Sequence, residues 1–258
     1  MWFYFSVIIT LVNLNLERIP LNTEIRLATF FLIVFCLLFF FKADKPVTKV
    51  VVIESPASVR KEISRGDTRK RQVIFTFDGG SEDVSGKRIL DTLAKYQIKT
   101  SFFLTGQFVK NNPELVRRMK RDGHEIYNHT LNHPHLTEVA DAEIVNQLEA
   151  MDNILKNLAG ISTKPYFRPP YGDRDKRVLD VAFKAGYQSV TWTVDARDWQ
   201  ETEGMTREGV KSIILDSLAN GNIYLIHIGD NITGDILEDV INETYKKGYK
   251  IVSLRQGL

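Results

Sequence analysis

The chain has 258 residues, of which 43% are hydrophobic and 26% are charged, and its formal net charge is +2. This composition is ordinary for a globular protein, and the weak net charge without a basic stripe argues against a nucleic-acid partner. The single cysteine, Cys36, excludes an internal disulfide.

Two uncharged and mostly apolar stretches, Met1–Leu16 and Leu27–Phe41, lie at the N-terminus. A helix over Leu27–Phe41 would be about 22 Å long, which is short of the roughly 30 Å hydrocarbon core of a membrane. No small-residue cleavage site follows it, which disfavours a cleaved signal peptide. We therefore predict that residues 1–42 form a membrane anchor with one short span or two.

The orientation of this predicted anchor depends on its flanking charges. If the segment with Arg18 and Arg26 stays in the cytoplasm, the rest of the chain lies outside. Lys42, Lys45 and Lys49 on the far side argue against this orientation. We predict a membrane-anchored protein whose folded domain is extracytoplasmic, at the cell surface.

Residues 43–70 combine prolines, serines and many charges, which predicts a linker, and one domain follows over residues 71–258. In this domain short apolar runs alternate with amphipathic helical patterns, which is typical of an α/β protein with a parallel sheet or an incomplete barrel. The predicted strands are 73–77, 99–104, 125–128, 166–167, 188–194, 223–228 and 250–254. The predicted helices are 85–96, 113–122, 137–158, 174–185, 206–219 and 235–247.

Polar side chains follow the ends of five of the predicted strands. Because the carboxyl ends of parallel strands meet at one edge of a sheet or one mouth of a barrel, we expect these side chains to converge. They are Asp78, the pair His129 and His133, Arg168, the pair Asp195 and Asp198, and His227.

Several of these residues also have a purely structural interpretation. Asp78 could cap a turn, and His227, which is flanked by apolar residues, could be a satisfied core histidine. His129 and His133 are four residues apart, so on one helical turn they would share a face, where neutral imidazoles suit zinc or a similar divalent cation. His135 could add a third ligand, although we interpret it as a loop residue.

Five motifs occur in order along the domain, namely TFDGG, HTLNH, RPPYG, DARDW and LIH. With this ordered set, which covers about Arg71 to Leu254, the chain resembles the polysaccharide deacetylases, the NodB-homology domains of carbohydrate esterase family 4. The resemblance implies a distorted, incomplete (β/α) barrel. It also implies removal of N-acetyl or O-acetyl groups from chitin oligomers, peptidoglycan or xylan.

The resemblance implies a catalytic role for four residues. Asp78 matches the catalytic base and Arg168 the residue that orients it. His227 matches the general acid, and Asp195 matches the carboxylate that tunes this histidine. Hydrolysis of an amide needs an activated water and a protonated leaving nitrogen, which a base and an acid supply.

The resemblance also implies a metal site and a substrate site. His129 and His133 match the ligands of a divalent metal, for which we expect zinc, with cobalt, nickel or manganese as alternatives. The backbone N–H of Tyr171 matches the donor to the oxyanion. Trp199 matches a groove wall, and Leu225 matches the pocket for the acetyl methyl group.

The first motif departs from the family pattern at Gly79, where the family usually has a second Asp that binds the metal. Some members with a substituted residue here resemble peptidoglycan deacetylases that act on muramic acid. Waters could complete the site, Asp78 could bind the metal itself, or Glu82 or Asp83 could reach in, although these two more simply cap a helix. We expect a weaker two-histidine site completed by water.

The expected activity is metal-dependent removal of N-acetyl groups from a cell-wall or related polysaccharide, either peptidoglycan or a chitin-like polymer of N-acetylhexosamine. Two alternatives stay open, an O-acetyl esterase acting on a glycan and a membrane-tethered glycan-binding module with catalysis impaired by Gly79. A binding module needs neither a base nor an acid, so the complete set of catalytic motif residues favours the enzyme.

Overall fold

The computed structural model describes residues 62–258 of the chain. The predicted membrane anchor, residues 1–42, and residues 43–61 of the predicted linker lie outside the described residues. Within residues 62–258, no helix has the length and apolar character needed to cross a membrane.

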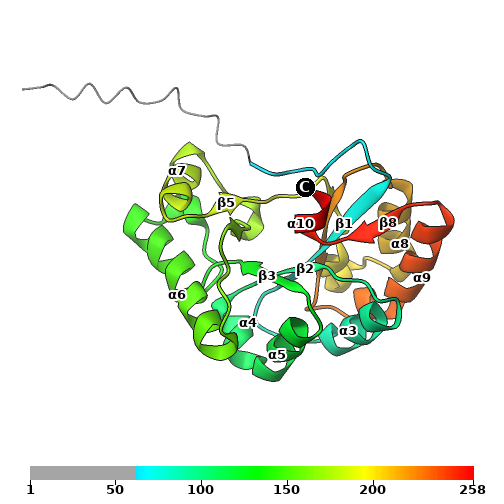
Figure 1. Ribbon diagram of the computed structural model, residues 1–258, viewed down its shortest axis with the longest axis horizontal. Helices are drawn as coiled ribbons and strands as arrows, with labels where there is room; N and C mark the ends of the chain where they lie inside the picture. Colours follow the sequence, from blue (N-terminus) through cyan, green and yellow to red (C-terminus); the bar gives the residue numbers. More distant parts are fainter. Residues whose placement is uncertain (1–61) are drawn as a thin grey trace, which may run out of the picture. The chain divides into compact units, whose positions relative to one another are not determined.

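A parallel eight-stranded sheet forms the centre of the described part (Figure 1). Its strands are β1 (Gln72–Gly79), β2 (Ser101–Leu104), β3 (Glu125–Asn128), β4 (Tyr166–Phe167), β5 (Gln188–Ser189), β6 (Val194–Asp195), β7 (Ile223–His227) and β8 (Lys250–Val252). The strand order is β5-β4-β3-β2-β1-β7-β6, and β8 pairs with Gln72–Ile74 of β1. In the described chain β5 and β6 end this order without pairing with each other, so the curled sheet is an incomplete barrel, as predicted.

Helices surround the curled sheet on its outer side (Figure 1). The α-helices are α3 (Gly86–Lys95), α4 (Gly106–Asn111), α5 (Pro113–Arg121), α6 (Asp141–Ala159), α7 (Lys176–Lys184), α8 (Arg207–Asp216), α9 (Ile232–Lys246) and α10 (Leu254–Gly257). Three 3₁₀ helices, η1 (Leu136–Glu138), η2 (Pro170–Gly172) and η3 (Asp198–Glu203), lie in the connections. Helices between parallel strands are the expected crossover connections of an α/β fold.

Strand β1 is buried along its whole length, as expected for a central strand covered on both faces. Phe75 and Phe77 pack in the outer layer with the helices, whereas Ile74 packs in the cluster inside the barrel. Side chains alternate along a strand, so Asp78 points inward at the barrel mouth and position 79 points outward. The pleat of β1 thus directs the Asp78 carboxylate into the mouth of the barrel.

The single strand predicted over residues 188–194 is wrong, because this segment forms β5 and β6 at opposite ends of the sheet order. Between them the chain bonds to other partners. Thr191 N donates to Ile63 O (2.8 Å), and Thr193 N donates to Ile223 O (2.8 Å). These bonds carry the chain across the gap in the barrel, which no local sequence pattern could reveal.

Residues just before β1 also belong to the barrel rather than to a free linker. Ile63 forms a parallel bridge with Val190, and Arg65 forms an antiparallel bridge with Asn222. Helix α4 was not predicted. It begins where the Thr105 side chain accepts from Phe108 N, and it is too short for its helical period to be recognised.

Candidate active site

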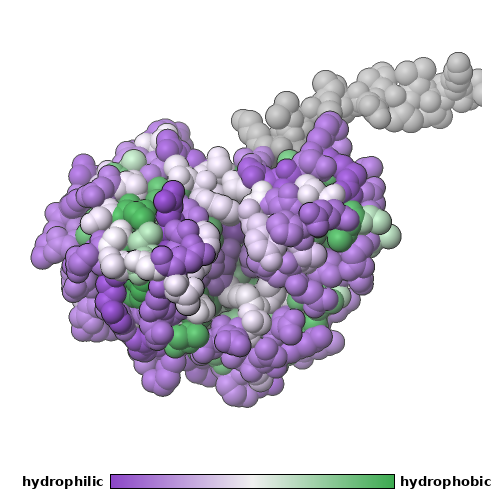
Figure 2. Space-filling model, turned by 180° about the vertical axis from the view of Figure 1, so that it is seen from behind, coloured by the Kyte–Doolittle hydropathy of each residue, from purple (hydrophilic) through white to green (hydrophobic). Residues whose placement is uncertain are grey.

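The predicted site residues converge on one cavity of about 430 Å³ at the carboxyl ends of the strands. All residues to which the resemblance gave a role line it, except Arg168, and Pro169 and Trp192 complete the wall. The lining residues are Asp78, His129, His133, Pro169, Tyr171, Trp192, Asp195, Trp199, Leu225 and His227. Figure 2 shows one face of the molecule, which is largely hydrophilic with small hydrophobic patches around a paler hollow.

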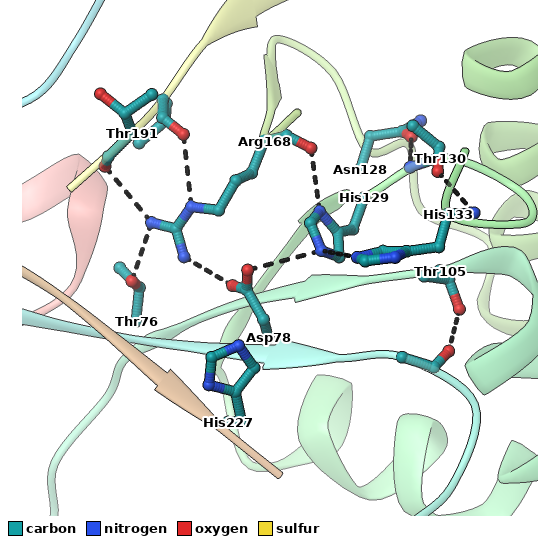
Figure 3. A network of polar contacts seen from close by, with 12 residues as sticks. Thr76, Asp78, Thr105, Asn128, His129, Thr130, His133, Arg168, Thr191 and His227 are labelled. Atoms are coloured by element: carbon teal, nitrogen blue, oxygen red, sulfur yellow. Dashed lines mark hydrogen bonds and ion pairs between the residues drawn. The ribbon is translucent and has the colours of Figure 1, made fainter. Parts of the chain in front are cut away.

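Asp78, at the end of β1, is held by Arg168 (Figure 3). Asp78 Oδ1 accepts from Arg168 Nη1 (2.5 Å), and Asp78 Oδ2 lies 3.5 Å from His129 Nε2. Thr76, two residues earlier on the same face of β1, accepts from Arg168 Nη2 through its hydroxyl oxygen (2.9 Å). The carboxylate is therefore fixed through one oxygen, and the other oxygen is directed toward the histidines.

Arg168 has no exposed surface, which is unusual for a charged side chain. Besides Asp78 and Thr76 it donates to the carbonyls of Val190 (3.3 Å) and Thr191 (3.4 Å). Burial lowers the pKa of Arg168, and the neighbouring Asp78 carboxylate opposes this change. The guanidinium stays charged, because its unperturbed pKa is far above neutrality, and it forms a fixed counter-ion behind Asp78.

His129 and His133 meet through a loop and not through a helical turn. Asn128 Oδ1 accepts from Thr130 N (2.8 Å), and Thr130 Oγ1 accepts from His133 N (3.0 Å). Thr130 and His133 adopt positive φ angles of 70° and 61°. This tight loop brings the Nε2 atoms of the two imidazoles to 3.1 Å from each other (Figure 3).

The two imidazoles fit the histidine part of a divalent-metal site. His129 Nδ1 donates to Arg168 O (2.9 Å), which leaves the lone pair on Nε2. Burial lowers the pKa of both rings, to about 4 for His133, so both are neutral and able to bind a cation. Two nitrogens about 2.1 Å from one cation lie roughly 3.0–3.4 Å apart, which agrees with the observed spacing.

A third protein ligand is missing from this arrangement. Within residues 62–258, no group of three or more His, Cys, Asp or Glu side chains forms a complete metal site. A Cβ atom at Gly79 would lie 2.7 Å from Leu104 Cδ2 and 3.0 Å from Phe108 Cδ2, so core side chains already fill that direction. Asp83 does not reach in either, since its Oδ1 accepts from Gly86 N (2.6 Å) at the start of α3.

The carboxylate that holds His227 is Asp198, and the prediction that Asp195 does so is wrong. Asp198 Oδ1 accepts from His227 Nδ1 (2.8 Å), and Asp198 Oδ2 accepts from His227 N (2.7 Å). Asp195 ends β6 and accepts from Arg197 N (2.8 Å). The left-handed turn at Arg197 reverses the chain and returns Asp198 to His227, so the later Asp of DARDW makes the contact.

The Asp198 contact determines the charge of His227. Burial alone would lower the pKa of His227, but the hydrogen bond and the charge of Asp198 raise it to about 9. Burial likewise opposes ionisation of Asp198, and the charge of His227 and its hydrogen bonds keep the pKa of Asp198 below its usual value. Around neutral pH the pair is an imidazolium and a carboxylate.

The predicted substrate residues surround these charged groups. Tyr171 has a positive φ of 58°, a strained conformation for a residue with a side chain, and the residue is 61% exposed. Its ring stacks on that of His135 with centroids 4.1 Å apart. His135 lies in the loop before η1, as interpreted from the sequence. Trp199 and Leu225 both line the cavity, Trp199 half exposed and Leu225 buried.

Sequence reasoning missed three contributions to this site. Thr76 could have been found, because it precedes Asp78 by two residues and so shares its face of β1. Asp198 could have been separated from Asp195 only by knowing the path of the turn. Trp192 lines the cavity from a segment that the sequence predicted as an ordinary strand.

Comparisons with known proteins agree with this geometry. The family model for polysaccharide deacetylase matches residues 65–190. Peptidoglycan-N-acetylmuramic acid deacetylase PdaA of Bacillus subtilis is 32% identical over 189 residues, covering 73% of this chain and 72% of that protein. Its solved structure, a family 4 carbohydrate esterase, matches with a TM-score of 0.73 at 31% identity over 77% of this chain and 85% of that one.

Two further relatives are described differently, one as a deacetylase and the other as a pseudoenzyme. A peptidoglycan-N-acetylglucosamine deacetylase of Bacillus cereus is 34% identical over 193 residues, covering 73% of this chain and 69% of that protein. A mutant of BA3943 from Bacillus anthracis, a CE4 family pseudoenzyme with restored activity, matches with a TM-score of 0.72 at 26% identity, over 77% of this chain and 71% of that one. The motif residues meet at one cavity and the relatives match most of the described domain, so the chain belongs to the polysaccharide deacetylase family.

Proposed function

We propose that this polysaccharide deacetylase removes N-acetyl groups from a cell-wall polysaccharide, peptidoglycan or a chitin-like polymer, with the help of a divalent cation. The observation that carries the proposal is the placement of Asp78 and His227 as register partners on neighbouring strands β1 and β7 at one cavity. A base and an acid at one site are what hydrolysis of an amide requires.

Asp78 is the base in this proposal. Arg168 Nη1 holds Asp78 Oδ1, so Asp78 Oδ2 is the oxygen that takes the proton of the attacking water. Because Arg168 is completely buried and bonded to four groups, the carboxylate has one orientation and no rotational freedom to lose. We assign positioning of the base to Arg168.

His227 is the acid. Its Nδ1–H is committed to Asp198, which leaves Nε2–H as the donor to the leaving nitrogen. The raised pKa of about 9 keeps this proton in place at neutral pH. We assign stabilisation of the oxyanion to the backbone N–H of Tyr171, whose strained backbone is consistent with a functional constraint.

His129 and His133 are the residues that would hold the cation. Bound there, a divalent cation would acidify a water molecule and polarise the acetyl carbonyl. We propose zinc, with cobalt, nickel or manganese as alternatives, and water as the remaining ligands, since Gly79 supplies none. The apolar surfaces of Trp192, Trp199 and Leu225 suit the faces of a sugar ring and an acetyl methyl group.

A second candidate function is glycan binding without catalysis. It is favoured by the substitution at Gly79 and by the similarity to BA3943, which is a pseudoenzyme before mutation. The retained contacts among Asp78, Arg168, His227 and Asp198 favour the enzyme, because a binding surface does not require a fixed base and a charged acid.

The decisive experiment incubates the purified full-length chain with peptidoglycan fragments and with chitooligosaccharides, with added zinc, cobalt or manganese and with a chelator. We expect mass spectrometry to show loss of acetyl groups from N-acetylated glycans, dependent on the metal and absent in His227→Ala. Release of acetate only from O-acetylated glycans would support the esterase. Glycan binding without acetate release under any condition would support the binding module.

We also propose that residues 1–42 anchor the chain in a membrane with the domain on the extracytoplasmic side. The support is the pair of uncharged N-terminal stretches, Met1–Leu16 and Leu27–Phe41, and the extracellular position of a cell-wall substrate. The test is fractionation of cells followed by protease treatment of intact spheroplasts. Recovery of the chain in the soluble fraction, or full protection from protease, would contradict this location.

A further inference from the structure

A second buried carboxyl group, that of Asp230, lies close to the His227–Asp198 pair and has no part in the proposed mechanism. Asp230 is only 5% exposed. Its Oδ1 accepts from Thr233 N (2.9 Å), but its buried Oδ2 has no hydrogen-bond partner among the described residues. Buried polar atoms without a partner are rare in native proteins, so this oxygen requires a physical explanation.

Thr233, in the first turn of α9, connects the two carboxyl groups. Its backbone N–H donates to Asp230 Oδ1, and its hydroxyl donates to Asp198 Oδ2 (2.6 Å). Only Thr233 bridges Asp230 and the Asp198 carboxylate that holds His227, so a change of charge on Asp230 is felt at Asp198. The two acidic groups form one electrostatic unit behind the proposed general acid.

The hydrogen bonds are divided unequally within this unit. Asp198 accepts from four donors, which are His227 Nδ1, His227 N, Trp199 N and the Thr233 hydroxyl. Asp230 accepts from one donor only. Ionising two neighbouring buried carboxyl groups costs free energy, because their charges repel and neither is fully solvated. The proton therefore stays on the group with the fewest hydrogen-bond donors, which is Asp230. Burial first, and then the charge of Asp198, raise the pKa of Asp230 to about 7.

Other charged groups nearby do not neutralise Asp230. Asp198 on η3 and His227 on β7 are the charged residues with the largest effect on it, and the Glu201 carboxylate of η3 accepts from Asn231 N (3.0 Å) next to it. Arg88 of α3 instead bonds to Asp235 and to the Asn231 side chain (3.1 Å). Within residues 62–258, Asp230 therefore forms no ion pair with Arg88, and the strongest charges acting on it are those of Asp198 and His227.

We propose that Asp230 is a positioning residue that holds a proton on Oδ2 in mildly acidic solution and releases it to solvent above neutrality. The negative charge that then appears beside Asp198 keeps His227 protonated at higher pH. This inference rests on the proposed function only where it concerns activity, since the proton on Asp230 exists whether or not the chain is an enzyme.

The test variant is Asp230→Asn in the full-length chain. The amide keeps an oxygen for Thr233 N and cannot ionise. We expect the alkaline limb of the kcat/KM profile to move to lower pH by roughly one unit, with a much smaller change near pH 6. The matched control is Asp239→Asn, at an exposed position of α9, the helix that follows Asp230, where the carboxylate pairs with Lys211 (3.3 Å).

Thermal unfolding tests the proton on Asp230 without any assay of activity. The folded-state pKa of Asp230 is raised, so the folded chain binds more protons than the unfolded chain between about pH 4 and 7. Wild-type stability therefore falls as pH rises through this window, and Asp230→Asn removes the fall. The Tm of the variant minus that of the wild type should increase by on the order of 5 °C from pH 4.5 to 8.

A third measurement uses the wild-type chain and decides the case even if the variant does not fold. Infrared difference spectra between pH 6 and pH 9 should contain the band of a protonated carboxyl group that is lost at high pH. Absence of this band, or a Tm difference that is constant with pH, would overturn the proposal. The proposal would also be overturned if Asp230→Asn lowered kcat/KM equally at all pH values without moving the alkaline limb. Asp230 would then have only the structural role of accepting from Thr233 N at the start of α9.

Discussion

Two buried carboxylates at the mouth of the barrel, Asp78 and Asp198, differ in how their oxygens are used. Asp78 lines the cavity, and only one of its oxygens is committed to Arg168. Asp198 has no exposed surface, and both of its oxygens accept two hydrogen bonds each. A group that takes up a proton needs a free lone pair, whereas a group that maintains a charge needs to be surrounded by donors. This difference separates the proposed base from the carboxylate that holds the acid.

The cations paired with these two carboxylates differ in the same way. Arg168 is buried and cannot lose its charge, so it fixes Asp78 permanently. His227 lines the cavity and titrates with a pKa of about 9, so it can deliver a proton and recover it. Asp78 is therefore paired with a cation that stays charged, Arg168. Asp198 is paired with a cation that can lose and regain its proton, His227.

The largest expected effect follows from breaking the first pair. In Asp78→Asn, the amide oxygen can still accept from Arg168, but it cannot take a proton from water. We expect kcat/KM to fall by about 10³-fold or more, and stability to fall by about 3 kcal/mol because the buried guanidinium loses its counter-ion. Acetate release gives the first quantity and denaturant unfolding the second. Activity within tenfold of the wild type would remove Asp78 from the role of base.

Breaking the second pair should have a smaller but pH-dependent effect. In Asp198→Asn the pKa of His227 should fall from about 9 toward or below its ordinary value, because the neutral amide no longer offsets burial. We expect about 10²-fold lower kcat/KM at pH 7.5 and an alkaline limb displaced to lower pH. Asp195→Asn is the matched control, since Asp195 lines the same cavity without contacting His227. Equal profiles for both variants would contradict the separation of these two residues.

The His227–Asp198 pair also makes the stability of the folded protein depend on pH, in a direction that can be measured. The pKa of His227 is raised on folding, so its contribution is complete below about pH 6.5 and is lost as pH rises through 9. The wild type should therefore lose stability in this range. Asp198→Asn should lack that decline, apart from changes shared with the Asp195→Asn control.

The inward direction of Asp78 follows from the two-residue period of a strand, once the neighbouring residues of β1 are placed. The sequence predicted the convergence of the strand ends, because the carboxyl ends of parallel strands meet at one mouth of a barrel. It failed where the chain leaves regular structure. Asp195 and Asp198 lie in one motif, and only the left-handed turn at Arg197 determines which of them reaches His227. The spacing of His129 and His133 suggested a helical turn, but hydrogen bonds from a loop bring them together.

The strand prediction over residues 188–194 failed for a related reason. Its apolar composition fits a strand, but non-local bonds to Ile63 and Ile223 divide it into β5 and β6. The local sequence determines which residues prefer extended structure, but contacts with distant parts of the chain determine which strands they pair with. The fold class could be predicted from alternation alone, whereas the gap in the barrel could not.

Placing an acidic residue beside Asp78 should not complete the proposed metal site. The side chain in Gly79→Asp would start toward Leu104 and Phe108, both completely buried, because position 79 faces the outer core. We expect a loss of about 1–3 kcal/mol from overpacking and no gain in zinc affinity by calorimetry. Gly79→Ala is the control for the steric part of the loss. Tighter zinc binding in the Asp variant, with unchanged stability, would show that the strand end can turn inward.

The smallest expected effect comes from removing one of the four donors around Asp198. Thr233→Val deletes the hydroxyl that bonds Asp198 Oδ2 but keeps the backbone N–H that bonds Asp230. Without this donor the carboxylate is held less firmly against His227 Nδ1, so that hydrogen bond weakens and the pKa of His227 should fall by less than one unit. We expect a two- to fivefold lower kcat/KM above pH 8 and little change near pH 6, whereas Thr233→Ser should match the wild type. A loss as large as in Asp198→Asn would mean that the surrounding donors, more than the carboxylate itself, control the charge of His227.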